Sequence, residues 1–130
     1  MKSASQKGET DLLTPEEITA VAYRALEDKK AKDVKILKTA EHTVLADYFV
    51  ICNGSSSTHI KALVDEVDKQ LSEAGEPPIR REGLRSDIWV LMDFGSVIVH
   101  IFTDEARKFY DLERLWSDAE AVAPSSLPSP

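Results

Sequence analysis

The sequence predicts an α/β fold in which helices flank a mixed sheet of four or five strands. Three observations predict it: some segments carry apolar residues at helical spacing, others are short apolar runs of strand length, and the two kinds are interleaved along the chain. A chain of 130 residues has the size of one domain. We therefore expect a single α/β domain over residues 14–118, with flexible tails at 1–13 and 119–130.

The first half of the chain predicts one helix and then two strands. The helix is expected to begin after Thr14, because Thr-Pro-Glu-Glu supplies an N-cap, a proline in the first turn and a glutamate that closes a capping box. Residues 33–38 alternate apolar residues with lysines, which is typical of a strand with one wet face. Residues 47–52 are apolar nearly throughout, which is typical of a central strand. The helix presents one apolar face, made by Ile18, Val21, Ala22, Ala25 and Leu26.

A second helix and a pair of strands are predicted to follow. A serine after Gly54 caps the helix, and Gly75 with the two prolines behind it ends the helix. Residues 87–92 and 96–102 are apolar strands joined by a tight turn, and residues 79–81 form a further short extended piece.

The C-terminal part predicts one helix followed by a tail. Thr103 is expected to cap a helix that continues to Ser117 and leaves Tyr110 and the surrounding charges exposed. Three prolines and three serines in the last seven residues oppose any helix or strand in the tail. The buried side of the helix is expected to consist of Phe109, Leu112, Leu115 and Trp116.

Composition narrows the classes of partner. Twenty-three acidic against sixteen basic residues give a net charge of −7, which disfavours direct nucleic-acid binding and suits a basic protein partner, such as a ribosomal protein. The single Cys52 cannot form an internal disulfide, and no apolar run has the length of a membrane span. Without an export or organelle signal at the N-terminus, we expect a cytoplasmic protein that does not bind membranes.

One motif points to an enzyme. Gly54-Ser55 followed by Glu66 and Asp68 is similar to a nucleotidyltransferase signature, in which two carboxylates hold Mg²⁺. Acids at i and i+2 share a face on a strand, but on a helix they diverge by about 200°. If residues 56–74 form a helix, this metal site fails, and we expect neither metal nor cofactor; if they form a strand, a nucleotidyltransferase or hydrolase remains the alternative.

Two weaker signals stay open. The loop from Gly54 to Thr58 is either a serine-rich helix cap or an anion site on backbone amides. His42, His59 and His100 lack metal-ligand spacing. His100, in an apolar strand, is either a structural residue at the margin of the sheet or a surface contact near the following loop.

Three blocks carry a resemblance to a known family. Residues 46–56 (ADYFVICNGSS), 89–102 (WVLMDFGSVIVHIF) and 107–116 (RKFYDLERLW) together resemble the ribosomal silencing factor family RsfS, also called Iojap-like, in the family's order. The resemblance covers residues 15–118, and Asn53 stands where many relatives have serine or threonine. It implies a nucleotidyltransferase-like fold without transferase activity.

The same resemblance implies a function that is not enzymatic. It implies a translational repressor that binds the large ribosomal subunit through ribosomal protein L-fourteen, blocks joining of the small subunit and aids maturation of the large one. It also implies a possible homodimer. The family's contact face, carried over residue by residue, falls on Trp89, His100, Asp104, Arg107, Lys108, Tyr110, Asp111 and Glu113.

Overall fold

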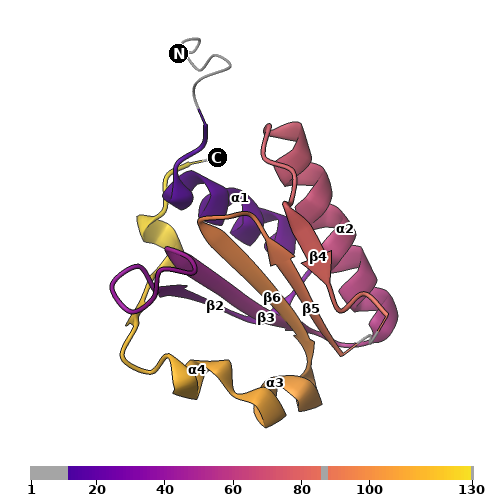
Figure 1. Cartoon of the computed structure of the whole chain (residues 1–130). Coiled ribbons are helices and arrows are strands. Elements are labelled where there is room, and N and C mark those ends of the chain that lie inside the picture. The colour runs from indigo at the N-terminus through magenta and orange to yellow at the C-terminus, as the bar shows by residue number, and fades with distance from the viewer. Residues whose placement is uncertain (1–11, 86–87, 130) are drawn as a thin grey trace.

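A mixed β-sheet forms the middle of the protein, whose computed structural model describes residues 12–85 and 88–129 (Figure 1). Within these residues the sheet has six strands in the order β4-β5-β6-β3-β2-β7, of which β3 and β6 are parallel and the other neighbours antiparallel. The strands are β2 (Lys32–Lys38), β3 (Tyr48–Gly54), β4 (Arg80–Glu82), β5 (Trp89–Asp93), β6 (Val97–Thr103) and β7 (Glu120–Ala121). The predicted α/β class is confirmed, whereas four or five strands was too few.

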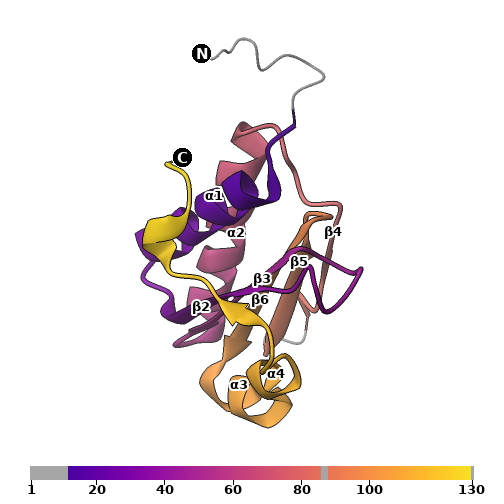
Figure 2. The ribbon, with the colours of Figure 1, turned by 90° about the vertical axis from the view of Figure 1, so that its left-hand side faces the viewer.

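Helices cover both faces of the sheet, but unequally. The long helices α1 (Pro15–Asp28) and α2 (Ser57–Glu73) lie on one face, and the short helices α3 (Asp104–Tyr110) and α4 (Leu112–Leu115) lie on the other (Figures 1 and 2). The predicted helix starts are confirmed: Thr14 and Glu17 form a complete capping box, and Ser56 accepts the His59 N–H at the start of α2.

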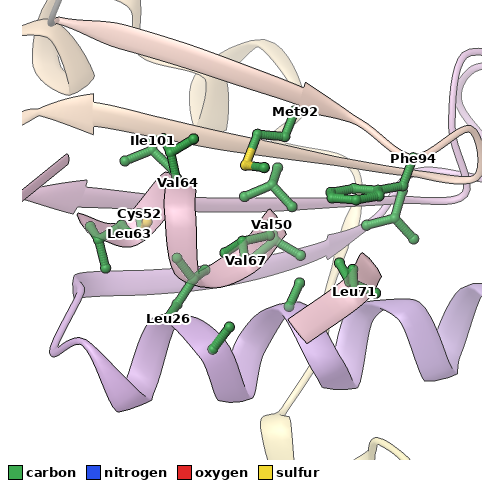
Figure 3. Close-up of a cluster of buried hydrophobic side chains, with 14 of the residues drawn as sticks. Leu26, Val50, Cys52, Leu63, Val64, Val67, Leu71, Met92, Phe94 and Ile101 are labelled. Atoms are coloured by element: carbon green, nitrogen blue, oxygen red, sulfur yellow. The ribbon is translucent and has the colours of Figure 1, made fainter. Parts of the chain in front are cut away.

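The main core lies between the sheet and the two long helices. The predicted alternation of β6 is confirmed, because Val97, Val99 and Ile101 all point into this core. Every residue of β3 is buried, as expected for a central strand. Figure 3 shows how α1 and α2 fill the space below the sheet with aliphatic side chains such as Leu26 and Leu71.

A smaller second core lies on the opposite face, beneath α3 and α4. Its buried members are Leu37, Ala46, Phe49, Ile51, Phe102 and Ala106, and Trp89, Ile98, Leu112, Trp116 and Ala119 pack around them half-exposed. Two short helices cannot cover this face as fully as two long helices cover the main core. The outer residues of the second core are therefore partly exposed to solvent.

The single C-terminal helix predicted to reach Ser117 is wrong, because Asp111 interrupts it. Asp111 adopts a left-handed conformation with φ 49° and ψ 54°, which aspartate tolerates better than most residues, and it separates α3 from α4. The chain therefore changes direction there, so apolar residues before and after Asp111 no longer share one stripe.

The predicted buried face of this helix is also partly wrong. Phe109 and Leu115 were expected in the core, but they are 80% and 72% exposed. Instead, α3 turns Ala106 and, one turn later, Tyr110 toward the sheet, while Leu112 and Trp116 are half-buried as described above. The helix is thus rotated by about one residue from its predicted orientation.

The expectation that residues 119–130 contain no helix or strand is wrong for the described part, which ends at residue 129. β7 pairs with β2, and the 3₁₀ helix η1 (Pro124–Ser126) follows it. The backbone N–H groups of β7 pair regardless of side-chain type, and Pro124 begins a 3₁₀ turn without strain. Residues 1–11 of the expected N-terminal tail and Asp87 of the expected strand lie outside the described residues.

Gly54 has a structural reason to be glycine. A Cβ at this position would lie 2.9 Å from Cγ1 of Ile60 and 3.2 Å from its backbone nitrogen, so the end of β3 packs directly against the first turns of α2. This contact accounts for the glycine of the Gly-Ser motif without a nucleotide.

We expect Gly54→Ala to lower the free energy of unfolding by about 1–3 kcal/mol, because the added methyl group overpacks this contact. Urea denaturation measures the change. Ser57→Ala, at an exposed position in the first turn of α2, is the control and should change stability by less than about 0.5 kcal/mol. Equal stabilities for the two variants would contradict the close packing.

Candidate partner-binding surface

The residues predicted to contact a partner gather on α3 and α4 and on the strands beneath them. Lys108, Tyr110 and Asp111 are exposed there, together with Asp104 at the start of α3. The remaining four lie deeper: Trp89 and Glu113 are half-buried, Arg107 has only 11% of its side chain exposed, and His100 is buried. The predicted set therefore forms an outer and an inner layer.

Arg107 connects four elements of the structure. Its guanidinium donates to the carboxylate of Glu113 on α4 at 2.8 Å, to the backbone carbonyl of Asp33 on β2 and to the side-chain oxygen of Asn53 on β3. Burial opposes ionisation of Glu113, but the hydrogen bonds and the positive charge of Arg107, together with a backbone hydrogen bond and the charge of Lys35, hold the pKa of this carboxyl below its usual range. Arg107 thus fixes α3 and α4 to the sheet.

Asn53 and Asp104 continue this network to the edge of β2. The buried Asn53 amide accepts from Arg107 and donates to Asp104, which also pairs with Lys32 at 2.8 Å. The hydrogen bonds from Lys32 and then Asn53 lower the pKa of Asp104. Next to the network lies a cavity of about 670 Å³, with walls that carry equal numbers of acidic and basic side chains, lined by Lys32, Asp33, Val34, Lys35, Asn53, Asp104, Arg107, Lys108, Asp111 and Glu113.

A stack of aromatic rings supports the other side of α3. Tyr110 lies 4.7 Å from Trp89 between ring centroids, and Trp89 stacks on Phe102 at 5.0 Å. The Trp89 indole N–H donates to Nδ1 of His100 at 3.2 Å, whereas Nε2 of His100 has no hydrogen-bond partner among the described residues. His100 is therefore buried among the rings of the second core, and it lies in a central strand rather than at the margin of the sheet.

Sequence reasoning missed the apolar part of this surface. Phe109 and Leu115 project from α3 and α4 beside a shallow hollow of about 540 Å³, which Lys108, Tyr110, Asp111 and Arg114 also line. Exposed large apolar side chains beside aromatic and arginine residues are typical of protein interfaces. Residues at i and i+4 share one face of a helix, so the spacing of Ala106 and Tyr110 in the sequence is the signal that could have predicted an inward face for these two residues and an outward position for Phe109.

The enzyme alternative loses its structural basis. Residues 57–73 are helical, and the side chains of Glu66 and Asp68 bond to Gln70 and to Ser72 and Arg81. In the described part of the chain, no group of three His, Cys, Asp or Glu side chains is arranged to hold a metal ion.

The loop after β3 is a helix cap in this structure. The Ser55 N–H donates to Nδ1 of His59 at 2.9 Å, and the His59 N–H donates to the Ser56 side chain at 3.0 Å. Both amides therefore bond within the protein, which favours the cap over the anion site.

His100 predicts a dependence of stability on pH. Burial lowers the pKa of His100 from 6.5 to about 4, so between these values the unfolded chain binds a proton that the folded chain does not. The free energy of unfolding should consequently fall by about 2 kcal/mol from pH 7 to pH 5. Urea denaturation at the two pH values measures it.

His100→Asn is the matched variant for this measurement, because asparagine keeps an acceptor near the Trp89 indole and does not titrate. We expect its stability to change much less between pH 7 and pH 5. If His100→Asn and the unmodified protein lost the same stability between pH 7 and pH 5, titrating groups other than His100 would account for the pH dependence.

Within residues 12–85 and 88–129, no helix combines the length and apolar character that crossing a bilayer requires.

The family model described as "ribosomal silencing factor during starvation" (RsfS) matches residues 13–129. This description is of a silencing factor and not of an enzyme.

Curated relatives agree with the family model. The ribosomal silencing factor RsfS of Bacillus subtilis is 39% identical over 102 residues, which is 78% of this chain and 86% of the relative. The mouse protein named "mitochondrial assembly of ribosomal large subunit protein 1" is 34% identical over 95 residues, covering 71% of this chain and 42% of the mouse protein.

Solved structures share the fold. A crystal structure of a protein from Chromobacterium violaceum has a TM-score of 0.79 and 39% identity, with 81% of this chain and 88% of that chain covered. A crystal structure from Bacillus halodurans has a TM-score of 0.73 and 36% identity, with 82% of this chain and 97% of that chain covered. With the family model matching nearly the whole described chain, this protein belongs to the ribosomal silencing factor RsfS family, also known as Iojap.

Proposed function

We propose that this protein is a translational repressor that binds the large ribosomal subunit through ribosomal protein L-fourteen and blocks joining of the small subunit. A role in maturation of the large subunit belongs to the same proposal, and the name of the mouse relative supports it. The observation that carries the proposal is the exposed apolar pair on α3 and α4, Phe109 and Leu115, in a member of this family.

The composition of this surface fits a basic protein that lies among RNA. Phe109 and Leu115 supply an apolar centre, which is where most binding energy of an interface resides. Asp111 and the net charge of −7 attract a basic partner. Lys108 and Arg114 reduce repulsion from nearby phosphates. This repulsion matters only at short range, because salt at physiological strength screens charges that are more than about 8 Å apart.

The predicted contact residues divide into two roles. Lys108, Tyr110 and Asp111 contact the partner directly, together with Phe109 and Leu115. Four others act through these residues, since their side chains are engaged within the protein: Arg107 and Glu113 hold α3 to α4, and His100 orients Trp89 beneath Tyr110. Asp104 lies at the edge of the surface and is paired with Lys32.

The proposal also covers the location of the protein in the cell, its self-association and the role of its fold. We infer a cytoplasmic location, in line with the bacterial relatives, although the mouse and Arabidopsis relatives are named as mitochondrial. A homodimer would use the same exposed apolar pair and therefore compete with the ribosome. The nucleotidyltransferase-like fold then serves as a scaffold without a transferase site.

Co-sedimentation with isolated ribosomal subunits over a salt series tests the proposal. The protein should sediment with large subunits and not with small ones, and it should slow the formation of joined ribosomes. Binding should weaken as salt rises, because exposed charges contribute to docking. Equal partition between the two subunits would rule the proposal out.

Phe109 separates binding from stability. Phe109→Ala should leave the melting temperature nearly unchanged, because the ring is exposed, but it should cost about 2 kcal/mol or more in binding, some thirtyfold in affinity. Ile79→Ala, at a position beside β4 that is also largely exposed (70%), is the control and should bind normally. Full affinity of Phe109→Ala would place the contact on another surface.

A further inference from the structure

The chain after α4 crosses from one face of the sheet to the other. Trp116 and Ala119 pack against the second core, β7 pairs with the edge of β2, and Val122 and Leu127 then pack against the main core. In Figure 2 this yellow segment rises from α4, passes the edge of the sheet and reaches α1. We call residues 116–127, which contact both cores, the C-terminal clip.

Backbone hydrogen bonds and apolar contacts fasten the C-terminal clip. Its strand β7 pairs with the end of β2, and the Val122 N–H donates to the Ile36 carbonyl at 2.9 Å. Beyond β7, residues 124–129 lie along α1, where Leu127 and the helix residues Ala20 and Tyr23 line a groove of about 330 Å³. The part of the clip that follows β7 is thus attached on the face opposite α3 and α4.

The two short helices depend on attachments outside themselves. Helices of seven and four residues are too short to be stable alone. Among the described residues, α3 buries only Ala106 and α4 buries none. Three attachments hold them: the Arg107 network, the contact of Tyr110 with Trp89, and Trp116 of the clip, whose ring contacts Phe49 edge-on at 5.4 Å. Of these, Trp116 is the one that follows α4 directly.

We propose that the C-terminal clip holds α3 and α4 in their binding position, so that contacts on the α1 face control affinity on the opposite face. When the clip opens, Trp116 loses its support and α4 leaves the sheet. Apparent affinity then falls in proportion to the population that remains closed. The effect on affinity rests on the proposed function, whereas the holding of α4 is a property of the chain itself.

Amide hydrogen exchange and subunit binding of the full chain test this proposal together. Leu127→Asp places a carboxylate against the apolar face of α1, and Leu127→Ala is the milder variant. Leu127→Asp should leave the clip open in most molecules, so that residues 111–119 lose most of their protection from exchange and affinity for large subunits falls about tenfold. Leu127→Ala should shift exchange and affinity in the same directions by less. Ser125→Ala, exposed in the same segment, should change neither, and α2 should remain protected in all variants.

Three results would overturn the proposal. Faster exchange confined to residues 120–127 would show that α4 is held without the clip. Lower affinity with normal exchange in α4 would mean that the clip contacts the partner itself, and normal affinity with fast exchange in α4 would remove its role in binding. If Leu127→Asp unfolds, Leu127→Ala decides. If the unmodified protein does not bind large subunits, the proposed function fails, while the exchange of α4 still decides whether the clip holds it.

Discussion

β3 and β6 run parallel in the middle of the sheet, and this pairing decides where both helical layers begin. The register places Gly54 beside Thr103, so α2 and α3 start at the same edge and leave it on opposite faces. Asn53, one residue before the end of β3, consequently lies within reach of both Asp104 and Arg107 on α3. Without the parallel pairing, the polar network that fixes α3 to the sheet would have no strand to join.

The unequal covering of the two faces separates stability from binding. The long helices α1 and α2 bury a thick aliphatic core, which supplies most of the apolar burial that stabilises the fold. The second core is small, and Phe109 and Leu115, on the two short helices that cover it, remain in solvent. The face of the sheet under α3 and α4 can therefore offer exposed apolar side chains to a partner, while the main core on the other face keeps the protein folded.

Local signals allowed much of the fold to be predicted from the sequence. Thr14, Ser56 and Thr103 cap their helices through contacts within four residues, so these starts follow from short motifs. The errors concern features that the tertiary structure decides. Asp111 adopts a left-handed conformation, and β7 pairs with a strand more than eighty residues earlier in the chain. Neither leaves a periodic pattern in the sequence.

The candidate surface was only partly predictable for a related reason. The sequence does not distinguish a charged residue that contacts a partner from one that forms an ion pair within the protein. Arg107 and Glu113 satisfy each other, and Lys32 satisfies Asp104, so these charges cancel within the structure. Asp111 makes no such ion pair among the described residues, and it also causes the break that turns the chain between Phe109 and Leu115. One residue thereby shapes the apolar surface and supplies a carboxylate beside it.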